Sequence, residues 1–323
     1  MASTQDPSKE SKAVRLPHSP DNPFNPPKSR FRQFPFRLPI KRSTVQLLRF
    51  HFSFFLLPVY LFALSQAPVI DREKALIIFC ILHLLVYPAS NGYNSYMDRD
   101  ETPIGGLASP MQPTRQLFFV TLCFDIVAVS LSVFVSPVFA LGILLYIMAS
   151  RAYSYRGIRL KKYPFTGFLT VFVFQGALIY FITSYALQPQ ISFSSLLVPC
   201  TISSLLIGAL YPLTQIYQHE ADKEDGVITI SYLLGKRGTF IFSMILFLSA
   251  TFLLYLRFNQ QMELNQFYLY LLIMLPVVLF FLYWMSRVWR NEEAANFRNS
   301  LTMNMLSTFC TTAFFVTLII LNH

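Results

Sequence analysis

The chain has 323 residues, of which 54% are hydrophobic and only 13% are charged, and its net charge is +10. With a mean hydropathy of +0.47, this composition excludes a soluble globular domain and predicts a protein that crosses a membrane several times. In such a protein lysines and arginines act as topology signals and bind anionic lipids, so we expect a lipid bilayer and no nucleic acid among its partners. The four cysteines lie within apolar stretches and form no Cys-x-x-Cys pair, which argues against a zinc site or a disulfide framework.

Residues 1–44 are polar, basic and rich in proline, and they lack the apolar stretch of a secretory signal peptide. Prolines break helices and polar residues bury no core, so we expect a disordered cytoplasmic tail. An organelle transit peptide is the alternative, but Asp6, Glu10 and Asp21 argue against it because such peptides contain few acidic residues. Residues 45–323 are then expected to form one transmembrane domain.

Nine apolar stretches follow, each read as one crossing of the bilayer, which takes roughly 17 to 25 residues. We therefore predict an all-α bundle of nine transmembrane helices. The fourth stretch is short and is separated from the third only by Ser136 and Pro137. The predicted spans are 46–66, 75–93, 116–135, 138–152, 165–187, 195–217, 238–257, 266–286 and 301–321.

The distribution of basic residues predicts the orientation of these spans. With the amino terminus inside, 23 of the 26 lysines and arginines fall on the cytoplasmic side, and only Arg72, Lys74 and Arg257 fall on the other. This asymmetry is what the positive-inside rule expects. We predict a multi-pass protein of the bacterial cell (inner) membrane, with the amino terminus and both acidic segments described below in the cytoplasm; the oligomeric state is left open.

The first acidic segment, residues 91–102, follows directly on the second predicted span. If that helix continues through the segment, Asn91, Asn94, Asp98 and then Glu101 or Thr102 recur every three or four residues and share one helical stripe. A concentration of acid in a basic, apolar protein indicates a bound cation.

Asp125 lies in the middle of the third predicted span, where a carboxylate is costly and therefore a candidate functional group. Protonation, pairing with His51 or His83, and a role as base toward an acceptor are all open, and a buried, hydrogen-bonded structural acid is the preferred interpretation. An ion-coupled transporter is a further hypothesis that rests on this residue and on a possible parallel repeat of two four-helix halves. Gln175 and Gln215 can form hydrogen bonds between helices or line a cavity, and the two interpretations are equally good.

The basic loop, residues 151–162, carries five lysines and arginines on the same side as the acidic segments. Some of these residues can grip phosphate oxygens, arginine in a bidentate manner. For each of them, a role as a positive-inside anchor is an equally good interpretation.

The second acidic segment, residues 218–226, follows the sixth predicted span. Gln218, Asp222 and Asp225 share one helical stripe, and Glu220 and Glu224 lie on a neighbouring one. Both acidic segments offer only hard oxygen ligands, which suit Mg²⁺ because it takes one or two carboxylates and keeps its other positions for water and phosphate.

These motifs resemble those of the UbiA superfamily of intramembrane prenyltransferases, over nearly the whole chain beyond the tail. The matching elements are Asn94 to Asp98 after helix two, Gln218 to Asp222 with Gly226 and Thr229 after helix six, and Tyr153-Ser154 with Arg159-Leu160-Lys161 between helices four and five. The resemblance implies a UbiA-like bundle around a central cavity. In it a polyprenyl diphosphate, held by Mg²⁺, is ionised and its prenyl group alkylates a lipophilic acceptor, expected to be an aromatic, quinone-type molecule.

The resemblance also implies roles for individual residues. Asp98, Asp222 and Lys161 are expected to be catalytic. The expected Mg²⁺ ligands are Asn94, Asp98, Glu101, Asp222 and Asp225. The expected substrate-binding residues are Asn91, Asn94, Arg99, Tyr153, Arg159, Lys162 and Gln218.

Two positions depart from the family pattern, and each removes a negative charge. Thr102 and Gln218 stand where aspartates are usual. Glu101 and Asp225 are candidate replacements, and Asp100 and Glu101 become the residues on which activity depends. The alternative function is a catalytically silent member of the family that binds an isoprenoid or another lipid.

Overall fold

The computed structural model describes residues 40–322, and the predicted disordered tail lies outside them except for its last five residues. Within the described residues the regular secondary structure is helical, apart from one isolated bridge between Ile104 and Leu107, and loops join the helices. The helices are α1 (Arg42–Leu48), η1 (Phe50–Leu56), α2 (Leu57–Ser65), α3 (Arg72–Phe79), η2 (Cys80–Val86), α4 (Tyr87–Asp98), α5 (Arg115–Val135), α6 (Pro137–Ser154), η3 (Leu160–Lys162), α7 (Pro164–Val171), η4 (Phe172–Leu178), α8 (Ile179–Leu187), α9 (Phe193–Gln215), α10 (His219–Glu224), α11 (Ile230–Gln260), α12 (Leu264–Arg290), η5 (Glu292–Ala294) and α13 (Phe297–Asn322).

Nine helical segments between residues 40 and 322 are long and apolar enough to cross a membrane, which confirms the predicted all-α fold and the number of spans. They are Arg42–Ser65, Arg72–Asp98, Arg115–Val135, Pro137–Ser154, Pro164–Leu187, Phe193–Gln215, Ile230–Gln260, Leu264–Arg290 and Phe297–Asn322. Most of them extend beyond the hydropathy boundaries, because polar residues continue a helix into the water layer without loss of backbone hydrogen bonds. The protein is therefore a multi-pass membrane protein.

Four of the spans are not continuous α-helices, and one of them, Ile230–Gln260, is kinked at Gly235. The first is divided by Arg49, which has a left-handed backbone (φ 47°) and ends α1 before the 3₁₀ turn of η1. The second and fifth contain the π-helical stretches η2 and η4. Such bulges occur frequently at functional sites because they rotate the side chains that follow them.

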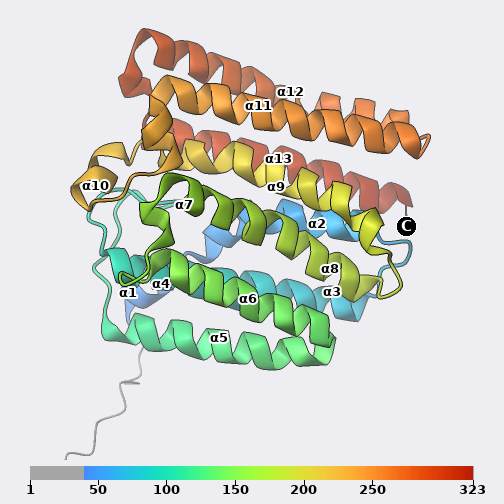
Figure 1. Ribbon diagram of the computed structural model, residues 1–323, viewed down its shortest axis with the longest axis horizontal. Coiled ribbons are helices and arrows are strands. Elements are labelled where there is room, and N and C mark those ends of the chain that lie inside the picture. The colour runs from blue at the N-terminus through green and yellow to red at the C-terminus, as the bar shows by residue number, and fades with distance from the viewer. Residues whose placement is uncertain (1–39, 323) are drawn as a thin grey trace, which may run out of the picture. The chain divides into compact units, whose positions relative to one another are not determined.

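The spans lie side by side, with α5 and α6 on one flank, α11 and α12 on the other, and α9 and α13 between them (Figure 1). Close packing brings η4 against α9, where a Cβ on Gly176 would lie only 2.4 Å from the Cα of Ser204. Small residues allow such close approach of membrane helices. The first acidic segment, the basic loop and α10 all lie at the same end of the bundle, at the left of Figure 1.

Candidate active site

The first acidic segment leaves the membrane helix earlier than the sequence pattern predicts. Helix α4 ends at Asp98, because Arg99 adopts a left-handed conformation (φ 56°). Asn94 and Asp98, four residues apart, remain on one face of this helix. The expected extension of the stripe to Glu101 or Thr102 is wrong, and both of these residues are exposed.

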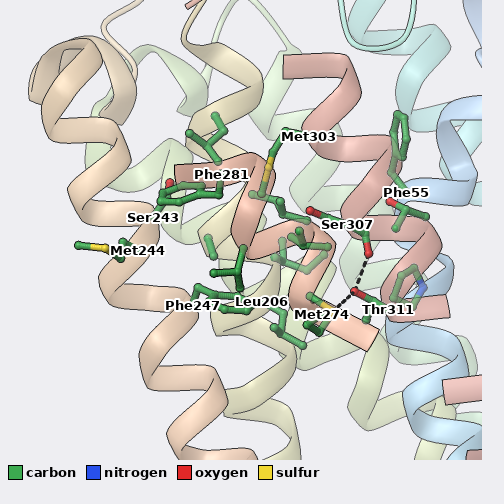
Figure 2. Close-up of a pocket in the computed structure, with 18 of the residues that line it drawn as sticks. Phe55, Leu206, Ser243, Met244, Phe247, Met274, Phe281, Met303, Ser307 and Thr311 are labelled. Carbon is green, nitrogen blue, oxygen red and sulfur yellow. Dashed lines mark hydrogen bonds between the residues drawn. The ribbon is translucent and has the colours of Figure 1, made fainter. Parts of the chain in front are cut away.

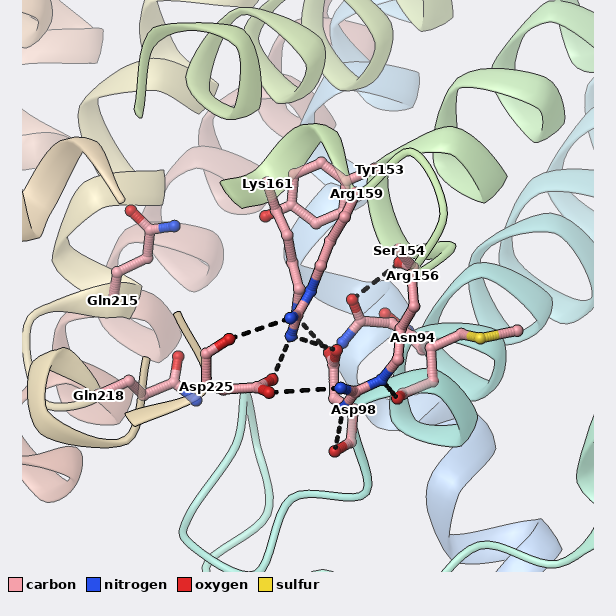
Figure 3. Close-up of polar contacts among 12 residues, drawn as sticks. Asn94, Asp98, Tyr153, Ser154, Arg156, Arg159, Lys161, Gln215, Gln218 and Asp225 are labelled. Carbon is pink, nitrogen blue, oxygen red and sulfur yellow. Dashed lines mark hydrogen bonds and ion pairs between the residues drawn. The ribbon is translucent and has the colours of Figure 1, made fainter. Parts of the chain in front are cut away.

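Asp98 is the centre of the polar contacts at this end of the bundle (Figure 3). Its side chain is only 3% exposed, and its Oδ2 accepts a hydrogen bond of 2.5 Å from Lys161 Nζ. Its Oδ1 is buried with no hydrogen-bond partner among the described residues, although Arg159 Nη2 lies 3.7 Å away. A buried carboxylate oxygen without a partner is costly, so this atom is available to a ligand.

The basic loop joins the two acidic segments. Arg159 pairs with the Asp225 carboxylate and also donates from Nη1 to the Asp225 backbone oxygen at 3.0 Å. Arg156 contacts both segments: its Nη1 lies 3.4 Å from Asp225 Oδ1, and its Nε donates to the Met97 backbone oxygen at 2.7 Å. The left-handed conformation of Arg159 (φ 52°) turns the chain back toward the bundle ahead of Lys161. Segments that are more than a hundred residues apart in sequence thus form one cluster, which we call the polar cluster.

Several predicted site residues lie beside the polar cluster and form hydrogen bonds with neighbouring segments. Ser154 Oγ donates to Asn94 Oδ1 at 2.9 Å. The phenols of Tyr153 and Tyr211 share a hydrogen bond of 2.5 Å. Gln218 Nε2 donates to the Pro103 backbone oxygen at 3.2 Å, so this departure from the family pattern links one acidic segment to the loop after the other.

Three predicted site residues are not brought into the polar cluster. Arg99, Glu101 and Lys162 are exposed, and none of them makes an ion pair with another described residue. The role of each in binding stays a prediction that the geometry does not support.

Arg49 is a site residue that the sequence analysis missed. Its side chain is buried, and it donates from Nη2 to the Asn91 backbone oxygen and from Nη1 to the Gly105 backbone oxygen, each at 3.2 Å. The loop lies so close that a Cβ on Gly105 would be 2.6 Å from the Phe52 ring, which only glycine permits. An arginine inside the first apolar span was the available signal, but it was counted as a topology charge.

Asp100 and Asp222 both have raised pKa values. Burial, with repulsion from Asp98, raises the pKa of Asp100 to about 6. Burial also raises the pKa of Asp222 to about 7, opposed by the charge of Lys161 and reinforced by Asp100 and Asp98. For Asp225 burial acts in the same direction, but the hydrogen bond and charge of Arg159 outweigh it, and the pKa of Asp225 is lowered. Asp100, which the sequence analysis did not include among the metal ligands, is thus electrostatically part of the polar cluster.

These shifts predict a pH dependence of stability in the absence of metal. Asp222 and Asp100 bind a proton more tightly in the folded chain than at their unfolded pKa of 3.8. Their contribution to the free energy of unfolding therefore falls as the pH rises from about 4 to about 7. His219 acts in the opposite direction, because burial lowers its pKa to about 4.

The effect of Asp222 is therefore isolated by comparing the wild type with Asp222→Asn. The thermal unfolding midpoint of each protein is measured at about pH 5 and at about pH 8. The wild type should lose stability relative to the variant as the pH rises. Equal changes in the two proteins would contradict the assignment of the raised pKa to Asp222.

A cavity of about 170 Å³ lies beside the polar cluster and is called here the polar-end cavity. Its polar wall includes Arg49, Asn91, Asn94, Tyr153 and Tyr211. Its apolar wall is formed by Phe52, Phe55, Leu56, Val171, Phe174, Ile207 and Leu210. The lining combines the charge of Arg49 and several neutral polar groups with aromatic and aliphatic side chains, and such a lining suits a molecule with an anionic head and a hydrocarbon tail.

No group of three or more His, Cys, Asp or Glu side chains among residues 40–322 is arranged to hold a metal ion by itself. The chemistry of the polar cluster nevertheless fits Mg²⁺ bound together with a diphosphate. Asp98 has a buried oxygen without a partner, and Asp100 and Asp222 are destabilised as anions by burial and by the charge of Asp98. A divalent cation relieves that repulsion, and phosphate oxygens complete its coordination.

Asp125 lies away from the polar cluster and has a partner that the sequence analysis did not consider. Its carboxylate pairs with Arg151, whose guanidinium also lies 3.9 Å from the centre of the Tyr93 ring. The suggested pairing with His51 or His83 is wrong: His51 contacts the Gly106 backbone oxygen, and His83 contacts that of Phe79. Arg151 therefore pairs with Asp125 and does not join the other cations of the basic loop in the polar cluster.

Comparison with known proteins identifies relatives of this arrangement. The sequence matches the model of the UbiA prenyltransferase family over residues 55–308. A search of curated proteins finds no match.

Three solved structures similar to the chain have 16% to 19% sequence identity, so they bear on the fold alone. A UbiA homologue from Archaeoglobus fulgidus, bound to DMAPP and Mg²⁺, has 16% identity, covers 86% of this chain and 99% of its own, and gives a TM-score of 0.63. A UbiA homologue from Aeropyrum pernix K1 has 16% identity, with 83% and 97% covered and a TM-score of 0.60. A digeranylgeranylglyceryl phosphate synthase has 19% identity, with 86% and 98% covered and a TM-score of 0.57.

Proposed function

Because the chain belongs to the UbiA prenyltransferase family, we propose that it transfers a prenyl group from a prenyl diphosphate to a lipophilic acceptor inside the membrane. The observation that carries the proposal is the polar cluster itself. Two acidic segments and the basic loop meet beside a cavity that Asn94 and Tyr153 line together with aromatic and aliphatic side chains. This is the charge pattern that a diphosphate with a hydrocarbon chain requires.

We propose that Asn94, Asp98, Asp100 and Asp222 hold Mg²⁺ together with the diphosphate, as the bound DMAPP and Mg²⁺ of the Archaeoglobus homologue suggest. When bound, the metal ion neutralises charge on the departing diphosphate and so promotes cleavage of the allylic C–O bond. Asp225 stays paired with Arg159 and orients that arginine, instead of serving as a ligand.

The cations of the basic loop act on the same anion. Lys161 and Arg159 lie next to Asp98, and their N–H groups donate to phosphate oxygens once the diphosphate arrives. Both side chains are nearly buried, at 12% and 10% exposed, so their positive charges are weakly screened by water. Their positions are set before the reaction, which favours stabilisation of the charge that develops on the leaving group.

The acceptor is proposed to be aromatic and to bind in the polar-end cavity beside the reacting carbon. Ser90 and Ser150, joined at 2.6 Å, line the cavity with Tyr146 and Gln175. These neutral side chains can hydrogen-bond the hydroxyl or carbonyl groups of a quinone precursor. We also propose that the polar cluster faces the bacterial cytoplasm, on the basis of the asymmetry in basic residues.

The test is to incubate membranes that contain the chain with a deuterated polyprenyl diphosphate and Mg²⁺, and to analyse the lipids by mass spectrometry. A new lipid carrying the deuterated prenyl group is expected, and it should be absent without Mg²⁺ and in membranes without the chain. Labelled prenyl diphosphate that is recovered intact, or only as its free alcohol, would argue against transfer.

A further inference from the structure

Asn304, on α13, lines the polar-end cavity but belongs to none of the segments that form the polar cluster. The residue is 8% exposed, and its amide makes no hydrogen bond with another described residue. Its Oδ1 and Nδ2 atoms are not sealed in the protein interior, so the accessible part of this amide faces the cavity. An unpaired amide in a membrane helix is costly, because lipid offers no hydrogen-bond partner.

Most hydroxyl groups of the same cavity wall already have partners within the chain. Ser90 and Ser150 share a hydrogen bond of 2.6 Å, and Thr214 donates to the Tyr211 backbone oxygen at 2.7 Å. Asn304 differs from them because its two N–H donors and its carbonyl oxygen are all free. The full hydrogen-bonding capacity of this amide is therefore available to a bound molecule.

Met303, the residue before Asn304, lines a different cavity, called here the apolar cavity (Figure 2). It has a volume of about 250 Å³, and no charged or amide side chain among the described residues lines it. Phe55, Ile207 and Leu210 line both cavities, and Asn304 lines only the polar-end cavity. A hydrocarbon chain lying against Asn304 would leave the amide unpaired, so we expect a group that contains oxygen at this place.

We propose that Asn304 binds a carbonyl or hydroxyl group of the aromatic acceptor and so selects oxygenated rings over hydrocarbons. The identity of this ligand as the acceptor rests on the proposed function. The group bound is neutral because the amide is neutral and α13 supplies no residue to the polar cluster. Phe52, Phe55 and Phe174 line the same cavity and offer aromatic walls to the ring.

The experiment compares the wild type with Asn304→Leu, which keeps the size of the side chain but removes the amide. The probes are duroquinone, a fully methylated benzoquinone, and durene, the same ring and methyl groups without the oxygens. The affinity of the full-length protein in nanodiscs for each probe is measured from the ligand-induced rise of the thermal unfolding midpoint. The ratio of the two affinities is compared between proteins, because partition of the probes into the bilayer then cancels. This ratio should favour duroquinone about tenfold more in the wild type than in Asn304→Leu, as the loss of one hydrogen bond implies.

Thr317→Val is the matched control, because this hydroxyl lies on the same helix, lines neither cavity and donates to the Ala313 oxygen at 2.8 Å. It should keep the wild-type ratio. Asp98→Asn should keep the ratio as well, so a failure of prenyl transfer and a failure of this inference give different results.

A second measurement separates the acceptor from the diphosphate. The probe is a thio analogue of geranyl diphosphate in which sulfur replaces the bridging oxygen, added with Mg²⁺. Its affinity should be the same for the wild type and Asn304→Leu. A weaker affinity in Asn304→Leu would overturn the proposal in favour of an amide that binds the diphosphate. Equal duroquinone-to-durene ratios in the two proteins, or a wild type that binds neither probe, would overturn it as well.

Discussion

Replacing Asp98 with asparagine is expected to lower the rate of prenyl transfer about 100- to 1,000-fold, the range seen when one preorganised electrostatic contact is removed. The substitution keeps the shape of the side chain but removes its charge. Lys161 and Arg159 then lose the carboxylate beside them, and the metal loses a hard oxygen ligand. The rate is measured with saturating prenyl diphosphate and Mg²⁺ in nanodiscs, and the fold is checked by circular dichroism.

Glu101→Gln is the matched control, because it removes one negative charge from the same acidic segment at an exposed position. Its rate should stay within about threefold of the wild type, since an exposed charge is largely screened. The assignment fails if Asp98→Asn keeps wild-type turnover, or if Glu101→Gln is impaired as strongly as Asp98→Asn.

Replacing Asp125 with alanine is expected to destabilise the fold by about 3–5 kcal/mol, the usual cost of removing one partner from a buried ion pair. Asp125 and Arg151 have side chains that are 10% and 22% exposed, so the remaining guanidinium would lie largely buried without a counterion. The free energy of unfolding is measured by denaturant titration in detergent.

The double variant Asp125→Leu, Arg151→Met tests whether the loss of stability comes from an unpaired buried charge or from lost packing. Replacing both charges with apolar groups of similar volume is often neutral or stabilising, so the double variant should recover most of the loss. A single variant as stable as the wild type would contradict a stabilising role for the Asp125–Arg151 pair.

The spans were predictable from the sequence because the bilayer imposes one requirement on every helix, a long run of apolar residues. The amino-terminal boundary of α11 was missed by eight residues. Its first turn is separated from the rest by Gly235, whose left-handed backbone (φ 68°) produces a kink that hydropathy does not detect. The π-helical stretches η2 and η4 were missed for the same reason, since they change the hydrogen-bond pattern and not the polarity.

The composition of the site was predictable only in part. The sequence indicated that acidic and basic residues would lie close together, because Asp98, Arg159 and Lys161 belong to segments at the same end of the bundle. It did not indicate that Arg99 would terminate α4, which removes Glu101 from the stripe. A single left-handed residue depends on tertiary contacts that no local pattern reports.

Contacts between residues that lie far apart in sequence could not be predicted either. The Arg151 partner of Asp125 and the contacts of Arg49 with Asn91 and Gly105 depend on how helices are rotated against one another. Gln218 illustrates the same point: in sequence it looked like a lost metal ligand, and in the structure its amide holds the loop at Pro103. A carboxylate at this position would repel that carbonyl oxygen instead of donating to it.

The most direct test of the proposed function is to measure pyrophosphate release by the purified protein in nanodiscs, with a polyprenyl diphosphate and a membrane lipid extract as the source of acceptor. The account predicts one pyrophosphate for each prenylated lipid formed, only when Mg²⁺ is present, and almost none with Asp98→Asn. Tight binding of the prenyl diphosphate with no pyrophosphate release, across a broad panel of acceptors, would contradict it and would identify the chain as an isoprenoid-binding member of its family.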